Sequence, residues 1–244
     1  MKITEANLVV IDCETTGFDY SAGDRVVEIA ASDFWRGNEM QMLVHPGRSI
    51  PIEVSAVHHI VDRDVAEAPS LDEAYDTLDL WLPENAVLVA HNAVFDRSML
   101  PSFEAYPWLC TRRLAQHLVP DAPAFKNQVL RYLFGGADLD LRRIAPHRAM
   151  ADVIVTSFVF RRLLDIWFAQ GGEDNIGALI ARANAPYLIE KMPFGKHRGV
   201  AMRDLDDGYL SWMLRTIEAS PENADLLFTV RAVLADRSGA MVSA

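Results

Sequence analysis

Residues 7–17 read NLVVIDCETTG, a short β-branched apolar run that ends in two acidic residues. The run predicts a buried strand over residues 7–12. Because side chains two positions apart on a strand project from the same face, Asp12 and Glu14 present a pair of carboxylates. They lie at the carboxyl end of the strand, which is where open α/β sheets bind ligands.

Two carboxylates that point together repel each other unless a cation lies between them. Hard oxygen ligands of this kind select Mg²⁺ or Mn²⁺. The chain contains 34 acidic residues, so an Asp-x-Glu sequence also arises by chance. Two solvated acids at a strand end therefore remain an alternative to a metal site.

The surrounding sequence predicts an α/β fold with a mixed sheet flanked by helices. Residues 26–35 and 40–44 are typical of an antiparallel hairpin across Gly37-Asn38, and residues 86–90 form another buried apolar run. Strands followed by alternating helices and strands favour this fold class. Helices are expected at 71–81 (after a capping box at 70–73), 111–118, 128–133 and 148–168.

The domain organisation follows from the same patterns. Residues 1–170 are predicted to form the α/β domain, and 171–189 a linker with a short helix near 176–183. Residues 190–244 are predicted to form a small C-terminal module, in which the part from about 220 onward carries no pattern that we can interpret. The chain has 244 residues, half of them hydrophobic, which is enough for one sizeable core and such a module.

Composition narrows the class of protein. No apolar stretch is long enough for a membrane span or the core of a signal peptide, and Cys13 and Cys110 lack metal-site spacing. We therefore expect a cytoplasmic protein without a membrane partner. A net charge of −11 argues against a basic nucleic-acid coat protein. Residues 112–148 nevertheless carry 7 Lys/Arg against 3 Asp/Glu, which fits either an approaching polyanion or a solvated helix face.

A second acidic motif, HNAVFD at residues 91–96, follows the strand at 86–90 directly. Asn92 is a good helix N-cap, which would place Asp96 one turn into a helix and facing the strand end. An ordinary capped helix with a surface aspartate is the alternative.

A third motif, HRAMAD at residues 147–152, opens the helix expected at 148–168. Asp152 falls on the apolar stripe of that helix, where an unpartnered carboxylate is costly, and a metal ion is one partner. Pro146 indicates that His147 lies on the loop before the helix, from where it can reach an attacking water. A loop histidine without a role is the alternative.

Together and in this order, the three motifs resemble the DEDDh exonucleases over about residues 6–168. The resemblance implies a ribonuclease H-like fold and 3′→5′ exonuclease activity that releases nucleoside 5′-monophosphates. It also implies that two divalent metal ions, Mg²⁺ or Mn²⁺, are held by Asp12, Glu14, Asp96 and Asp152, and that His147 is the general base.

The resemblance further implies a set of substrate contacts. Phe18 is expected to stack on or wedge against the terminal base, unless it is a core residue at the rim. His59 stands where many relatives have glycine, and Cys13 is expected to point away from the metal ions. The predicted substrate-binding residues are Thr15, Gly17, Phe18, His58, Ile60, Asn92 and Phe95.

The C-terminal module contains FGKHRG at residues 194–199 and YLSW at 209–212. This pattern after a DEDDh domain is similar to the bacterial exodeoxyribonuclease X family, which implies a DNA substrate and a role in DNA repair. Lys196 and Arg198 are candidate DNA contacts. In the alternative, Tyr209, Trp212 and Met213 form the small core of the module.

Three other functions remain open. An RNA 3′-end trimming exonuclease has the same metal site, and a proofreading exonuclease like DNA polymerase III epsilon has the same catalytic domain. A catalytically inactive nucleic-acid-binding protein is the alternative from another class. The sequence does not predict protein partners, oligomeric state or pathway.

Overall fold

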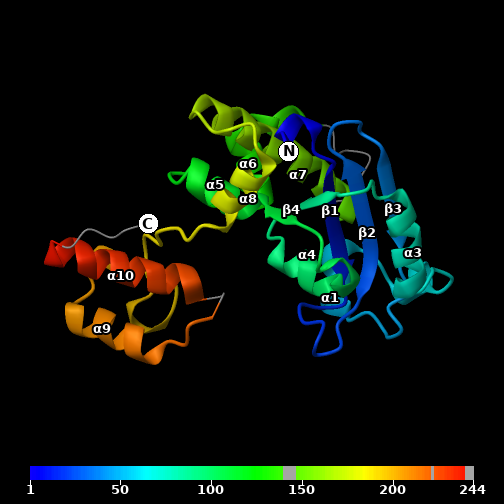
Figure 1. Cartoon of the computed structure of the whole chain (residues 1–244). Coiled ribbons are helices and arrows are strands. Elements are labelled where there is room, and N and C mark those ends of the chain that lie inside the picture. Colours follow the sequence, from blue (N-terminus) through cyan, green and yellow to red (C-terminus); the bar gives the residue numbers. More distant parts are fainter. Residues whose placement is uncertain (140–146, 221–222, 240–244) are drawn as a thin grey trace. The chain divides into compact units, whose positions relative to one another are not determined.

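The computed structural model of the chain describes residues 1–139, 147–220 and 223–239 (Figure 1). The chain divides into two compact units, Met1–Asn184 and Ala185–Ala244. Among the described residues, no helix combines the length and the apolar character needed to cross a bilayer.

The first unit is built on a five-stranded mixed sheet with the strand order β3-β2-β1-β4-β5. Strand β2 is antiparallel to both β1 and β3, whereas β4 and β5 run parallel to β1. The predicted hairpin and mixed sheet are therefore confirmed. The strands are β1 (Leu8–Thr15), β2 (Val26–Asp33), β3 (Glu39–Leu43), β4 (Val87–Ala90) and β5 (Trp108–Cys110).

Helices cover both faces of this sheet. The α-helices of the first unit are α1 (Ile52–His58), α2 (Asp62–Val65), α3 (Leu71–Trp81), α4 (Val94–Met99), α5 (Thr111–Leu118), α6 (Asn127–Leu133), α7 (Ala149–Ala169) and α8 (Ile176–Asn184). Its 3₁₀ turns are η1 (Ile3–Glu5), η2 (Pro101–Phe103) and η3 (Gly136–Asp138).

Alternation along β1 distributes its apolar run between two cores. Leu8 and Val10 belong to one buried cluster with α7, which packs against β1 and β2, while Val9 and Ile11 belong to a second cluster with α3. Side chains of a strand alternate between the faces of its sheet, so a strand covered on both faces is apolar throughout. The unbroken run at 8–11 thus reflects burial on both sides and fixes β1 in the centre of the sheet.

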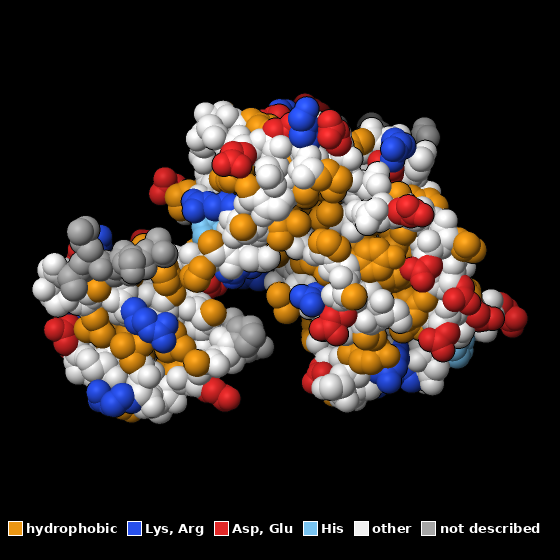
Figure 2. Space-filling view, viewed as in Figure 1, with side chains coloured by type: hydrophobic (Ala, Val, Ile, Leu, Met, Phe, Trp, Pro, Cys, Tyr) orange, Lys and Arg blue, Asp and Glu red, His pale blue; other side chains and the backbone are white. Residues whose placement is uncertain are grey.

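The second unit has a core of its own, formed mainly by methionine and leucine. It contains η4 (Gly195–His197), η5 (Met202–Asp204), α9 (Asp207–Thr216) and α10 (Ala224–Ser238), and α9 packs against α10. The fully buried members of its core are Met192, Met202, Leu205, Leu210, Met213, Leu226 and Val230. Hydrophobic side chains also reach the surface on both units (Figure 2).

The predicted elements differ from the structure mainly in the short segments. The capping box at Ser70 and the bounds of α3 and α5 are as predicted, and α7 begins and ends one residue later than expected. Helix α8, which we expected in a linker, packs against α5 and β5 in the first unit. The sequence did not predict β5 or α10, which lack a long periodic pattern.

Candidate active site

Three carboxylates converge at the carboxyl end of β1. Asp12 and Glu14 lie on β1, and Asp152 lies in the first turn of α7, which packs against β1 and β2. One oxygen atom from each of the three lies within 4.8 Å of the others. This donor set consists only of hard carboxylate oxygens and fits a divalent cation such as Mg²⁺ or Mn²⁺.

Asp96, on α4, lies near this group, and its charge raises the pKa of Asp12. It lies in the first turn of α4, is 2% exposed, and accepts a hydrogen bond from the backbone N–H of Cys13 at 3.2 Å. The Cys13 Sγ lies 3.5 Å from the same Asp96 oxygen. Strand alternation turns the Cys13 side chain away from Asp12 and Glu14, as expected, but toward α4, so that it contacts Asp96, another predicted metal ligand.

Asn92 does not cap α4, contrary to the prediction. Its backbone is left-handed (φ 72°), its carbonyl accepts the Phe95 N–H at 2.9 Å, and α4 begins only at Val94. Asparagine adopts this backbone conformation more readily than most residues. Its side chain is exposed and accepts a hydrogen bond from Arg112 at 3.2 Å. Asp96 still lies in the first helical turn, as expected.

Burial raises the pKa of all four carboxyl groups. It raises that of Glu14 to about 8 and that of Asp96 to about 7. Burial and then repulsion from Asp96 and Asp152 raise the pKa of Asp12 well above its usual range, and burial raises that of Asp152 while His147 opposes the shift. Without a cation, the cluster therefore retains protons that free carboxyl groups would lose.

His147 lies directly before α7, is exposed, and has a left-handed backbone (φ 54°). Its charge lowers the pKa of Asp152, so the two groups are close enough to interact. His147 thus lies at the loop position that the sequence indicated, and its role at the carboxylate cluster stays a prediction.

A buried ion pair, absent from our sequence-based predictions, anchors the residue after His147. Glu28 on β2 is fully buried and accepts hydrogen bonds from Arg148 Nε at 2.9 and 3.1 Å and from Arg148 Nη2. The same carboxylate accepts the Ala149 N–H at 3.0 Å and the Gln41 amide at 2.7 Å. Glu28 therefore caps the first turn of α7 from a distant strand. A glutamate inside an apolar strand was the clue that such a partner exists.

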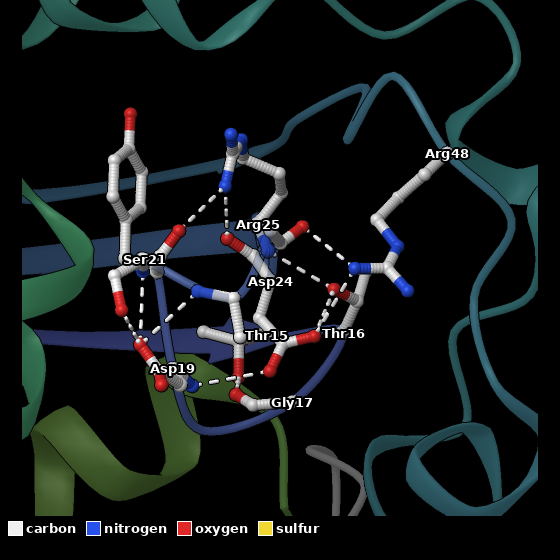
Figure 3. A network of polar contacts seen from close by, with 11 residues as sticks. Thr15, Thr16, Gly17, Asp19, Ser21, Asp24, Arg25 and Arg48 are labelled. Carbon is white, nitrogen blue, oxygen red and sulfur yellow. Dashed lines mark hydrogen bonds and ion pairs between the residues drawn. The ribbon is translucent and has the colours of Figure 1, made fainter.

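The loop after β1 is held by a polar network around Asp24 (Figure 3). Asp24 accepts hydrogen bonds from the Asp19 N–H at 3.1 Å and from Arg48 at 3.3 Å. A Cβ on Gly17 would lie 2.2 Å from the Asp24 carboxylate, so the network requires glycine at this position. The loop is thereby fixed close to the end of β1.

This loop presents Phe18 to solvent. The side chain is 83% exposed, and its ring centroid lies 6.2 Å from that of Phe95 on α4. Phe18 is therefore not a core residue, which was the alternative. Thr15 is 7% exposed, and its hydroxyl donates to the Gly17 carbonyl.

The predicted pocket residues His58 and Ile60 are both buried. The His58 Nδ1 accepts the Ile60 N–H at 3.0 Å, and burial lowers the pKa of His58. Ile60 packs with Val27 and Val65 in a small cluster. His59 between them has φ 63°, a left-handed conformation that explains why glycine suits this position. The His58 and Ile60 side chains support the fold here, and their contact with a substrate stays a prediction.

His91, the first residue of the second motif, has a structural role. Its Nδ1 lies 2.9 Å from the Thr111 hydroxyl, and its Nε2 lies 2.9 Å from the Phe125 carbonyl. Burial lowers its pKa to about 4, so the ring is neutral at physiological pH. It joins the end of β4 to the start of α5.

Lys196 and Arg198 lie in the second unit, at and directly after η4, and both are exposed. They are therefore contributed by a different unit from the carboxylates.

Two family models match the chain. The family described as "Exonuclease" matches residues 9–160, and the family described as "Putative quorum-sensing-regulated virulence factor" matches residues 186–222 in the second unit. Exodeoxyribonuclease 10 of Escherichia coli (strain K12) is 31% identical over 229 residues, which cover 88% of this chain and 94% of the relative. A DNA polymerase III subunit epsilon-like protein of Rhodobacter capsulatus is 34% identical over 69% of this chain and 25% of that protein.

Solved structures agree with this assignment. The structure entitled "Exonuclease X in complex with 5′ overhanging duplex DNA" has a TM-score of 0.54 and 29% identity, covering 72% of this chain and 99% of that one. Exonuclease I of E. coli in complex with a dT13 oligonucleotide has a TM-score of 0.56 at 17% identity, covering 88% of this chain and 61% of that one, which shows the fold alone. The chain therefore belongs to the exonuclease family, with the ribonuclease H-like fold of the DEDDh enzymes, and is a 3′→5′ exonuclease.

Proposed function

We propose that the chain is a 3′→5′ exodeoxyribonuclease that releases nucleoside 5′-monophosphates from DNA ends and acts in DNA repair in the cytoplasm. Asp12, Glu14, Asp96 and Asp152 would hold two divalent metal ions, Mg²⁺ or Mn²⁺. The convergence of Asp12, Glu14 and Asp152 oxygens within 4.8 Å of one another carries the proposal.

The electrostatics of the site support a cationic occupant. Asp96 is buried and the other three carboxyl groups are partly buried, and burial raises the pKa of all four although Arg148 and His147 partly oppose the shifts of Glu14 and Asp152. Divalent ions, when bound, stabilise negative charge on the attacking and leaving oxygens and make the attacking water more acidic. The residues of the chain hold this charge and orient the phosphodiester.

His147 is the proposed general base. Its exposed imidazole can accept the proton of the attacking water, and the nearby Asp152 carboxylate stabilises the imidazolium that results. The Glu28–Arg148 pair fixes the backbone on the helix side of His147. The backbone next to His147 is thus fixed, while its imidazole ring stays accessible to solvent.

The terminal nucleotide is proposed to bind beside Phe18. The exposed ring can stack on the last base, and such stacking contributes about 1–3 kcal/mol. The absence of a side chain on Gly17 allows the strand to approach the backbone. Thr15, His58, Ile60, Asn92 and Phe95 complete the proposed substrate-binding set.

The similarity of the chain to a named exodeoxyribonuclease and to a solved exonuclease structure supports a DNA substrate. The relative named exodeoxyribonuclease 10 aligns along 94% of its length, and the matching exonuclease X structure contains DNA. The metal site itself does not read the sugar, so the choice between DNA and RNA requires a direct comparison.

The test uses purified full-length protein, DNA and RNA strands labelled at the 5′ end, and Mg²⁺. We expect a ladder of DNA shortened from the 3′ end, no ladder with Asp12→Ala, and an unchanged ladder with Asp72→Ala, an exposed aspartate on α3. Equal or faster shortening of RNA would make the chain an RNA-trimming enzyme. No hydrolysis with either Mg²⁺ or Mn²⁺ would leave a nucleic-acid-binding protein.

A further inference from the structure

We propose that the second unit carries its own binding surface for single-stranded nucleic acid, which stacks bases at a distance from the 3′ end. The surface consists of Lys196, His197, Tyr209 and Trp212, which we call the aromatic surface. The proposal rests on the proposed function in one respect, since it takes nucleic acid as the substrate of the chain.

The aromatic surface is a continuous set of ring contacts. The rings of Tyr209 and Trp212 are stacked, with centroids 5.4 Å apart and planes inclined by 26°. The His197 ring packs edge-on against Tyr209 at 4.5 Å, and the Lys196 ammonium lies 5.4 Å from the centre of the same ring. Two stacked rings with an adjoining cation match the combination that single-stranded nucleic acids need, a platform for bases and a charge for phosphate.

Burial separates this surface from the core of the unit. Met213 is fully buried, as expected for a core residue, whereas Trp212 is 45% exposed and lies outside the buried cluster. Tyr209 only packs against the edge of that cluster. A large aromatic ring left exposed on a small unit, while methionine and leucine fill its core, is better explained by a ligand than by folding.

The turn before the stacked rings is basic, whereas acidic residues flank it at Glu190, Asp204, Asp206 and Asp207. Residues 191–203 contain four basic residues and no Asp or Glu, in a chain whose net charge is −11. Gly195 and Gly199 have left-handed backbones (φ 71° and 84°), so the turn that carries Lys196 and Arg198 requires glycine at both ends. The turn presents Lys196 next to the stacked rings.

The presence of two binding sites on one chain determines how the affinity should depend on strand length. Two binding sites on one chain reinforce each other only for a ligand long enough to reach both. Loss of the aromatic surface should therefore weaken the binding of long strands while the binding of a dinucleotide at the carboxylate site changes far less. Stacking energies of about 1–3 kcal/mol correspond to a change of about 5- to 150-fold in the affinity for a long strand.

The first measurement is equilibrium binding of a long oligodeoxythymidine strand to full-length Asp12→Ala protein in EDTA. We expect Trp212→Ala and Lys196→Ala, each added to this background, to weaken binding, and Trp212→Phe to restore most of it. Leu188→Ala and Arg231→Ala serve as matched controls, because they remove an exposed leucine and an exposed arginine from the same unit. Binding by Trp212→Ala as tight as that of the controls would overturn the proposal and leave a protein partner for this surface.

The second measurement is kcat/KM on the long strand divided by kcat/KM on a dinucleotide, in the active enzyme with Mg²⁺. We expect Trp212→Ala to lower this ratio through KM of the long strand. An equal loss on both substrates would mean a general structural defect and would also overturn the proposal. Because the binding experiment needs no hydrolysis, it tests the aromatic surface even if the proposed nuclease function fails.

Discussion

Glu14 and Glu28 are direct neighbours on β1 and β2, yet their carboxylates have opposite electrostatic environments. Glu28 is fully buried and receives the Arg148 guanidinium, the Ala149 N–H and the Gln41 amide. Glu14 faces other acids, and its pKa is raised to about 8 by burial and then by repulsion from Asp152 and Glu28.

The difference separates a carboxylate used for structure from one used for chemistry. A buried charge must be paired or it destabilises the fold. Glu28 is paired from within the chain, so it can hold the start of α7. Among the described residues, no ion pair joins the cluster around Glu14 to a cation, and Arg148 and His147 only partly oppose its raised pKa values, so its stability depends on protons or on metal ions from outside.

The largest effect is expected from Glu14→Gln. This change removes one charged oxygen donor from the proposed metal site, and we expect kcat on 3′ DNA ends to fall by about 10³-fold or more. The same change removes repulsion, so in EDTA above pH 8 the variant should melt at a higher temperature than the parent. A kcat within tenfold of the parent would contradict a role for Glu14 in holding metal.

The same substitution at Glu28 should act in the opposite direction on stability. Glu28→Gln leaves the Arg148 charge without its partner, and we expect the free energy of unfolding to fall by about 3 kcal/mol. Denaturation with urea in EDTA measures it. Glu39→Gln, at an exposed position of β3, is the control and should change stability by less than about 0.5 kcal/mol.

A second variant, Arg148→Gln, tests whether the loss of stability comes from the Glu28–Arg148 interaction or from Glu28 alone. Arg148→Gln should destabilise the protein as well, and the double variant should lose much less than the sum, because both changes break one interaction. Additive losses would show that Glu28 and Arg148 act independently. We also expect kcat of Glu28→Gln to fall, since the backbone that holds His147 is then less well fixed.

The sequence predicted the elements that rest on local patterns. The apolar run at 8–11, the capping box at Ser70 and the long periodic helix α7 each contain their own signal. The convergence of Asp12, Glu14 and Asp152 could also be predicted, because the end of β1 and the start of α7 carry recognisable motifs.

Features that depend on long-range contacts could not be predicted in the same way. Strand β5 has three residues, too few to show a period, and it is defined by its pairing with β4. The Glu28–Arg148 pair joins positions 120 residues apart. The sequence showed a charge inside an apolar strand but not which cation lies against it. The left-handed Asn92 likewise depends on its surroundings more than on its identity as a good capping residue.

A smaller effect is expected from pH in the absence of metal. The pKa of Glu14 rises on folding from 4.5 to about 8 and that of Asp96 from 3.8 to about 7, so the folded state binds more protons in this window. Stability must then fall as pH rises from about 4 to 8. Melting curves over this range in EDTA and in Mg²⁺ test the comparison. The fall in melting temperature with pH should be smaller in Mg²⁺, because bound cations stabilise the charged folded state. The same dependence on pH in EDTA and in Mg²⁺ would argue against metal binding at the cluster.

The smallest effect is expected at Cys13, the residue between the two acids of β1. Its backbone N–H donates to Asp96 at 3.2 Å, while its thiol lies farther away at 3.5 Å and is a weak donor. Cys13→Ala keeps the backbone bond, so kcat on DNA should fall by less than about tenfold and stability by about 1 kcal/mol. Cys13→Ser, whose hydroxyl is a stronger donor, should keep kcat near that of the parent. A loss in Cys13→Ala as large as that in Glu14→Gln would show that the thiol, and not the strand backbone, holds Asp96 in the cluster.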